Sequence, residues 1–269
     1  MYNLNKIWII LGDKKLDIIA SKDNELYKSL KKLKTKKYRE IEGSFLAEGR
    51  KFLEFEETPK LILFKEGISQ EIVEMAQKHE CRKIVLNEKL FKELTSQENS
   101  QGVIICYNSK VQKLEKIDNN VVVLNRVSDP GNLGTIIRVA DAAGFKDIIL
   151  TKGSVDCYNE KTVRSSMGSI LSVNIHYVEE SEVMEFLKER GYKVIVTALE
   201  KDSIPYTKMT LGDKNAFVFG NEGDGVSQEL ILKSDEKVII PIYGSAESLN
   251  VAMATGIILY DVRNKLENK

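Results

Sequence analysis

The sequence predicts an α/β protein whose C-terminal half holds a parallel sheet. Five short runs rich in valine, isoleucine, leucine and phenylalanine lie in this half, and segments with helical spacing of apolar residues separate them. Runs without polar alternation are typical of parallel strands covered by helices on both faces. The expected strands are residues 121–124, 147–150, 193–196, 216–219 and 238–242.

The composition narrows the class of protein. The 269 residues include 40 basic and 40 acidic side chains, and this zero net charge argues against attraction of the whole chain to nucleic acid, although a local basic face remains allowed. Cys81, Cys106 and Cys157 are far apart, and the histidines are His79 and His176. We therefore expect no disulfide framework and no metal site.

No apolar run approaches the ~20 residues of a membrane helix, and the run at residues 7–11 is shorter than a signal-peptide core. We expect a cytoplasmic protein that does not contact membranes. Because the globular pattern begins near Leu16, residues 1–15 are interpreted as a possible extension.

The N-terminal part predicts a smaller α/β unit over residues 16–108. Helices are expected at 23–40, at 69–78 with Ser69 as N-cap, and at 88–95, with strands at 61–64, 83–86 and 102–106. The polar segment that follows predicts a linker at 109–118, so that the second domain spans 119–269.

Residues 28–51 hold a strong basic bias, with nine basic side chains against three acids. A solvated helix face and a phosphate-contacting surface are equally good interpretations of this bias. If the second interpretation holds, the residues expected to contact RNA phosphates are Lys36, Lys37, Arg39 and Arg50.

Three loops follow the ends of predicted strands, where ligands bind to parallel sheets. In the first loop, Pro130 and Gly131 predict a turn, a helix runs from about residue 133 or 134 to 143, and Gly144 ends it. Gly134 indicates close approach of another group, and Arg138 lies one turn into the helix.

The second loop, 220–225, has three glycines around Glu222, and the third, 243–250, leads into a helix at 251–265 that is rich in small residues. Pro241 indicates that the preceding strand ends there or lies at an edge. Any one of these loops is a weak signal for a nucleotide-binding site. The three loops together, each at a strand end and in this order, are a specific signal.

Together the loops resemble the motifs of the SpoU branch of the SPOUT RNA methyltransferases, also called the TrmH family. The resemblance rests on Asn132–Arg138, on Phe219–Gly223, and on Ile240–Pro241 with Ser248–Ala252. Residues 159–168 also resemble a family stretch near the active site. The N-terminal unit resembles the L30e-like RNA-binding domain of the ribosomal-RNA members, through residues 45–50 and 100–103.

The resemblance implies a deep trefoil knot formed by the second and third loops, and S-adenosyl-L-methionine bound there. It also implies a homodimer with the active site close to its interface. Small residues on the last helix suit tight packing, either in a dimer or within one chain. The residues expected around the cofactor are Thr197, Ala198, Leu199, Gly220, Ile240, Ile242, Leu249 and Asn250.

The resemblance further implies methyl transfer to a ribose 2′-hydroxyl, with Arg138, Asn132, Glu222, Ser248 and Asn250 as catalytic candidates. An arginine rarely loses its proton, so stabilising the developing alkoxide or clamping a phosphate is the easier role for Arg138. Glu222 is expected to fix Arg138 or the loop geometry, while Asn132 and Asn250 orient the ribose or shape the loop.

Each candidate has an alternative interpretation. Asn132 suits a turn, Ser248 suits a helix cap, and Arg138 suits a surface ion pair. Lys161 and Arg164 are expected to contact RNA, and a generic basic surface is nearly as good an interpretation.

The separate N-terminal unit favours ribosomal RNA, specifically 23S RNA, as substrate. Transfer RNA and an antibiotic-resistance role remain alternatives within the same enzyme class. A non-catalytic RNA-binding or ribosome-assembly factor is the alternative from another class. A generic nucleotide-binding enzyme is disfavoured, because the chain has neither GxGxxG nor a phosphate-binding GKS/GKT loop.

Overall fold

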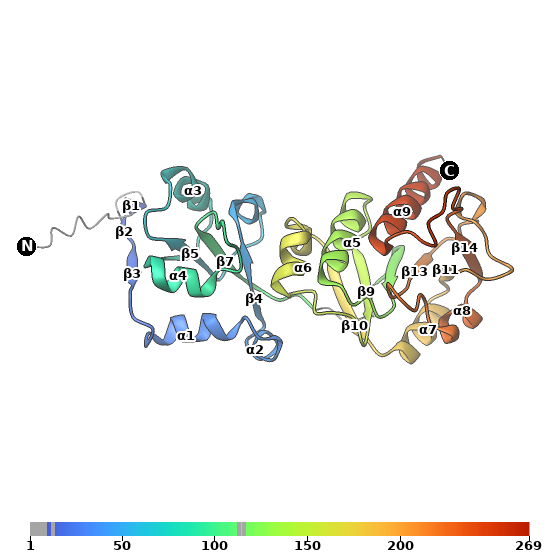
Figure 1. Ribbon diagram of the computed structural model, residues 1–269, viewed down its shortest axis with the longest axis horizontal. Helices are drawn as coiled ribbons and strands as arrows, with labels where there is room; N and C mark the ends of the chain where they lie inside the picture. Colours follow the sequence, from blue (N-terminus) through green and yellow to red (C-terminus); the bar gives the residue numbers. More distant parts are fainter. Residues whose placement is uncertain (1–9, 12–13, 112–113, 115–116, 269) are drawn as a thin grey trace, which may run out of the picture. The chain divides into compact units, whose positions relative to one another are not determined.

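The computed structural model describes residues 10–11, 14–111, 114 and 117–268, so most of the predicted extension at 1–15 lies outside the described residues. The chain forms two compact units (Figure 1). The first ends at Ser109 and also includes Tyr158–Glu160, and the second comprises Lys110–Cys157 and Lys161–Lys269.

The first unit is built on a mixed five-stranded sheet with the strand order β3-β6-β5-β7-β4. Its core gathers leucines and isoleucines from these strands and from two of its helices. The strands are β3 (Asp17–Ile19), β4 (Ser44–Glu48), β5 (Leu61–Lys65), β6 (Arg82–Leu86) and β7 (Val103–Asn108). The helices are α1 (Glu25–Lys32), α2 (Lys36–Glu42), α3 (Gln70–Met75) and α4 (Glu88–Leu94), and a short pair, β1 (Ile10–Leu11) and β2 (Lys14–Lys15), precedes them.

The single helix expected at 23–40 is wrong, because the chain breaks it into α1 and α2. Thr35 is extended, with φ −105° and ψ 131°, which ends one helix and begins the next. The Arg39 guanidinium donates a hydrogen bond to the Leu33 carbonyl oxygen at 2.8 Å. A buried cation therefore satisfies a carbonyl group at the end of α1.

The second unit is built on a seven-stranded sheet with the order β10-β9-β8-β13-β11-β14-β12, and every strand pair in it is parallel. This confirms the predicted parallel sheet. The last predicted strand ends early, at Ile239, two residues before Pro241. The strands are β8 (Val121–Leu124), β9 (Asp147–Thr151), β10 (Asn174–Val178), β11 (Lys193–Thr197), β12 (Ile204–Pro205), β13 (Asn215–Phe219) and β14 (Glu236–Ile239).

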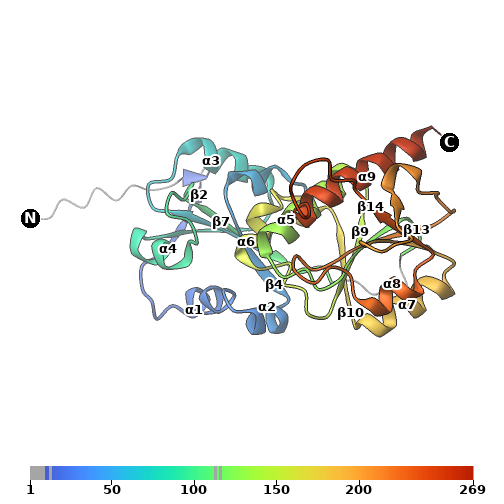
Figure 2. The ribbon, with the colours of Figure 1, turned by 45° about the vertical axis from the view of Figure 1, so that its right-hand side comes forward.

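Helices cover both faces of this sheet, with α5 and α9 on one face and α7 and α8 on the other (Figures 1 and 2). Valines of β8, β11 and β13 pack against leucines, isoleucine and methionine of α7 and α8 in one buried cluster. This packing holds the strand ends in fixed places. The helices are α5 (Pro130–Ala142), α6 (Glu160–Ser165), α7 (Glu180–Glu189), α8 (Gln228–Lys233) and α9 (Val251–Glu267).

Helix α5 begins earlier than the sequence suggested, so the turn predicted at Pro130 and Gly131 is wrong. Asp129 is the N-cap, and its carboxylate accepts a hydrogen bond from the backbone N–H of Asn132 at 2.8 Å. Proline suits the first helical position, because that position needs no N–H donor. The helix ends as predicted before Gly144, which has φ +80°.

Gly134 brings the backbones of α5 and α6 into direct contact. A Cβ atom at this position would lie 2.4 Å from the Thr162 carbonyl oxygen and 3.0 Å from the Ser166 backbone nitrogen. By contrast, a Cβ at Gly256 on α9 would meet only a Val139 methyl group at 3.6 Å. The small-residue face of α9 therefore packs against α5 of the same chain.

Among the helices of the described residues, none is long and apolar enough to span a membrane. The longest, α9, has 17 residues and carries several charged side chains.

We expect Gly134→Ala to destabilise the fold by about 1–3 kcal/mol, because the backbone atoms around the added methyl group cannot move aside. Gly256→Ala is the matched control, since it also replaces a helical glycine but meets only ordinary contact distances. It should leave stability unchanged or raise it by up to about 1 kcal/mol. Chemical denaturation measures both, and equal effects would contradict the tight contact.

Candidate functional site

The loops that follow β8, β13 and β14 meet at the carboxyl edge of the parallel sheet, and Glu222 joins the first two. Its carboxylate accepts hydrogen bonds from the Ser128 backbone N–H (3.1 Å), the Ser128 hydroxyl (2.9 Å), the Asp129 backbone N–H (3.1 Å) and the Asn132 side-chain amide (2.9 Å). These four donors tie the glycine-rich loop to the start of α5.

Asn132 extends this connection to the third loop. Its side-chain oxygen accepts a hydrogen bond from the Asn250 amide at 2.9 Å. The Asn250 side-chain oxygen in turn accepts from the backbone N–H groups of Ala252 and Met253 and so caps α9. Glu222, Asn132 and Asn250, three of the five catalytic candidates, therefore form one hydrogen-bonded chain across all three loops.

The hydrogen bonds keep Glu222 ionised at neutral pH. Partial burial raises the pKa of its carboxyl, but the donors from Asn132, Ser128 and Asp129 outweigh burial and leave the pKa below its usual value. An ionised carboxylate only accepts hydrogen bonds. Glu222 thus acts as an anchor for the surrounding donors, as expected for a residue that fixes the loop geometry.

Asn221 shapes the glycine-rich loop itself. Its side-chain oxygen accepts a hydrogen bond from the Gly223 backbone N–H at 2.8 Å, and its amide donates to the Arg126 carbonyl oxygen at 2.7 Å. The backbones of Asn221 and Gly225 also pair with each other. Gly220 permits this closure, because a Cβ there would lie 2.0 Å from the Gly225 carbonyl carbon.

A cavity of about 770 Å³ opens between these loops. Its lining is mainly apolar side chains and loop backbone, together with a few carboxylates, and the structure brings all eight residues expected around the cofactor into it. Asn132, Glu222 and Ser248 also line it. Those eight residues are Thr197, Ala198, Leu199, Gly220, Ile240, Ile242, Leu249 and Asn250.

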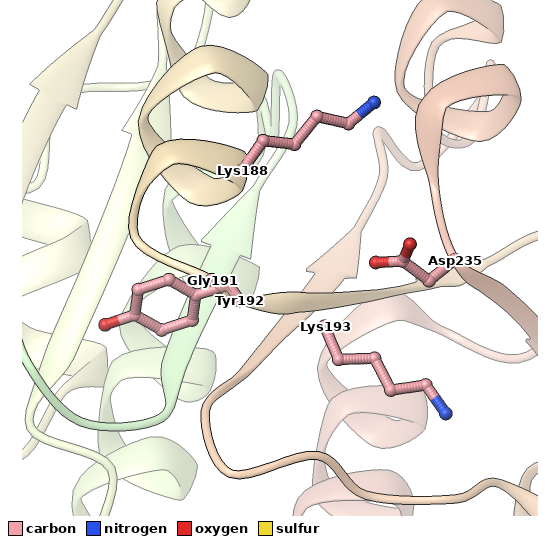
Figure 3. Close-up of a pocket in the computed structure, with 5 residues that line it drawn as sticks. All are labelled: Lys188, Gly191, Tyr192, Lys193 and Asp235. Carbon is pink, nitrogen blue, oxygen red and sulfur yellow. The ribbon is translucent and has the colours of Figure 1, made fainter.

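A second hollow, of about 550 Å³, lies at the start of β11, on the opposite edge of the sheet from the loops (Figure 3). Its polar groups already serve the fold: Asp235 accepts a hydrogen bond from the Val194 backbone N–H, and Lys193 pairs with Glu236. This hollow therefore carries no candidate chemistry.

The structure does not bring Arg138 into the cavity formed by its own chain. Arg138 is exposed on α5 and does not line that cavity. Glu222 makes its contacts with Ser128, Asp129 and Asn132 rather than with Arg138. The arginine thus belongs to a different surface of α5 from Asn132.

The predicted RNA contacts divide into surface and buried residues. Lys36, Lys37 and Arg50 are exposed in the first unit, and Arg50 pairs with Glu71 at 3.2 Å. Lys161 and Arg164 are exposed on α6, and Lys161 pairs with Asp129 at 3.0 Å. Arg39 is 6% exposed and caps α1, so its expected place on an RNA-contacting surface is wrong.

Sequence reasoning missed Ser128 and Asp129, and it included Asn221 in the second motif without giving it a role, although all three set the shape of the site. Asp129 was detectable, because an aspartate directly before proline at the start of a helix predicts an N-cap. Ser128 contributes partly through its backbone N–H, which any residue type offers. Among the described residues, no group of three or more His, Cys, Asp or Glu side chains is arranged to hold a metal.

We expect Glu222→Gln to lower the melting temperature by about 2–4 °C at neutral pH, which corresponds to about 1 kcal/mol for a partly exposed group. Because the pKa of Glu222 is lowered on folding, its ionised form stabilises the chain above the usual value of 4.5. That contribution disappears as the pH falls through the lowered pKa. Thermal unfolding of both proteins from pH 7 down to about pH 3 should therefore show a shrinking difference.

Asp224→Asn is the control, since this neighbouring carboxylate accepts no hydrogen bond from the first loop. A difference between wild type and Glu222→Gln that stays constant with pH would contradict the anchoring role.

Comparison with known proteins places this geometry in a family. Residues 119–260 match the model of the SpoU rRNA Methylase family, and residues 24–105 match the model of the MRM3-like substrate binding domain. The Bacillus subtilis 23S rRNA (guanosine(2553)-2′-O)-methyltransferase RlmP is 36% identical over 91% of this chain and 98% of its own length.

Two further proteins show how much of the chain such relatives cover. The tRNA (guanosine(18)-2′-O)-methyltransferase of Aquifex aeolicus is 35% identical, but over only 58% of this chain and 74% of its own. The crystal structure of an AdoMet-bound rRNA methyltransferase from Sinorhizobium meliloti superposes with a TM-score of 0.82 at 31% identity, covering 93% of this chain and 98% of that one.

These matches confirm the resemblance that the three loops and the N-terminal unit carry. The family model covers the whole parallel sheet and the three loops, and relatives of similar length align with both units. The chain belongs to the SpoU rRNA methylase family.

Proposed function

We propose that this protein transfers a methyl group from S-adenosyl-L-methionine to a ribose 2′-hydroxyl in 23S ribosomal RNA. The observation that carries the proposal is the hydrogen-bonded chain Glu222–Asn132–Asn250, which joins the three family loops beside one cavity. A relative that aligns over nearly the full chain is named for this reaction.

The cavity suits the cofactor in size and chemistry. Its volume lies within the range of roughly 300–1,000 Å³ that is usual for ligand sites. Ile240, Ile242 and Leu249 offer apolar surface for an adenine ring, and the loop backbone offers hydrogen bonds for its edge. The carboxylates of Glu200 and Asp224 suit a ligand with net positive charge.

The chain's own residues would position the ribose rather than act as strong bases. When bound, the cofactor supplies an electrophilic methyl group on a sulfonium. Asn132, Asn250 and Ser248 line this cavity, and their amides and hydroxyl would hold the ribose hydroxyl in line with that methyl group. Arg138 lies outside the cavity of its own chain, so it would keep its proton and bind an RNA phosphate.

The substrate class follows from the two-unit architecture. The relative named for 23S rRNA aligns with both units, whereas the relative named for tRNA aligns with little more than half of the chain. This favours ribosomal RNA, with the first unit as the substrate-binding domain and the second as the methyltransferase domain. The knot in the second unit stays an expectation from the family resemblance. Such an enzyme would act in the cytoplasm.

A homodimer through α9 completes the proposal. Met253 is 63% exposed, Ile257 36% and Tyr260 49%, and their spacing places them on one side of α9. Such an apolar stripe on a helix favours burial against a second copy.

We expect purified protein to transfer labelled methyl from S-adenosyl-L-methionine to unmodified 23S rRNA. Arg138→Ala should lower kcat/KM about 100-fold, the size expected for loss of a group that stabilises or positions the reacting atoms. Its affinity for S-adenosyl-L-methionine should stay unchanged, because Arg138 does not line the cavity. Full activity of Arg138→Ala, or a wild type that transfers no methyl, would contradict the proposal.

We expect Ile257→Glu to convert the dimer into monomers, because a charge would be buried in the apolar contact. Size-exclusion chromatography with light scattering measures the mass. Leu232→Glu is the matched control, since Leu232 is 78% exposed but lies on α8. A wild type that is already monomeric, or a variant that stays dimeric, would exclude this interface.

A further inference from the structure

Met167 combines two unfavourable features in one residue. Its φ of 51° lies in the left-handed region, which among the described residues only Arg126 shares outside glycine. Its side chain is 44% exposed, although it is large and apolar. A side chain in this conformation is strained, and an exposed apolar group gains no stabilisation from burial. The fold alone therefore does not account for methionine here.

The turn that presents Met167 is rigid. The backbone N–H of Met167 donates to the Arg164 carbonyl oxygen at 3.1 Å, and that of Ser169 donates to Ser166 at 3.0 Å. Ser166 is fully buried, and its hydroxyl donates to the Val163 carbonyl oxygen at 2.7 Å. Strain of this kind persists where surrounding contacts impose it, and it often marks places where a ligand is held.

The same turn lies against the face of α5 that carries Arg138. The turn packs on Gly134 through Ser165 and Ser166. Two residues that are four positions apart on a helix point in directions that differ by only ~40° around the axis. Arg138 therefore projects on the Gly134 side of α5. The Lys161 Cε atom lies 3.2 Å from the Cβ position of Gly131, which is on this face as well.

The charges on this face are unbalanced. Arg138 and Arg164 are both exposed, and neither has an acidic partner within the part of the chain that the structure describes. Lys161 adds a third exposed cation, although it pairs with Asp129. A single apolar side chain among cations matches a nucleic acid strand, which offers phosphates and flat bases side by side.

We propose that Met167, Arg138 and Arg164 form a surface, here called the Met167 surface, that holds the RNA strand next to the target nucleotide. The two guanidinium groups bind phosphates, and the Met167 thioether packs against the face of one base. This inference rests on the proposed RNA substrate and adds a base-contacting residue that none of the three loops contains.

Met167→Gly separates a functional role from a structural one. Glycine adopts positive φ without strain, so the variant should be as stable as wild type or more stable. Its Kd for a fluorescently labelled fragment of unmodified 23S rRNA should nevertheless rise, between about twofold and tenfold. Met167→Leu should keep most of the affinity, and Leu232→Ala is the control for loss of an exposed apolar side chain.

Salt dependence distinguishes the base contact from the phosphate contacts. Arg164→Ala should reduce the slope of log Kd against log salt by about 0.7, the value for one phosphate of a single strand. Met167→Gly should leave that slope unchanged. In the methylation assay, Met167→Gly should raise KM for RNA while the affinity for S-adenosyl-L-methionine stays that of wild type.

Unchanged RNA affinity in Met167→Gly would overturn the Met167 surface. Dissociation of a dimer in this variant would also overturn it, because Met167 would then contact protein. The binding experiment needs no methyl transfer. A wild type that binds the RNA but does not methylate it would refute the proposed function, while the Kd values would still test this surface.

Discussion

The site depends on one carboxylate. Glu222 accepts four hydrogen bonds from the loop after β8, although about ninety residues of sequence separate the two loops. Asn132 takes part in this contact and at the same time accepts a hydrogen bond from Asn250. A shift of Glu222 would therefore move the start of α5 and the cap of α9 together. The cavity between the three loops and the start of α5 share this anchor.

The sequence was sufficient for the parallel sheet, because runs such as 121–124 and 216–219 have no polar alternation and are buried on both faces. It was insufficient where tertiary contacts decide the local structure. Arg39 stabilises the break between α1 and α2. The basic residues around it in the sequence had suggested that it was a cation on the surface. The start of α5 was misplaced, because Pro-Gly is compatible with both a turn and the first turn of a helix.

For the site, strand order and the family resemblance located the cavity, since all eight expected residues line it. The sequence placed Arg138 one turn into the helix after the first loop, but the structure was needed to show that Arg138 lies outside the cavity that Asn132 lines. The partners of Glu222 were hidden for a different reason. Half of these hydrogen bonds come from backbone N–H groups, which carry no signal in residue type.

The central claim is that these loops form a ribose methyltransferase site for ribosomal RNA. The most direct measurement is a map of ribose 2′-O-methylation across 23S rRNA from cells with and without this protein. The account predicts that one ribose loses its methyl group in cells without the protein and regains it with wild type but not with Arg138→Ala. Identical maps from both kinds of cell would contradict it and favour an RNA-binding role without catalysis.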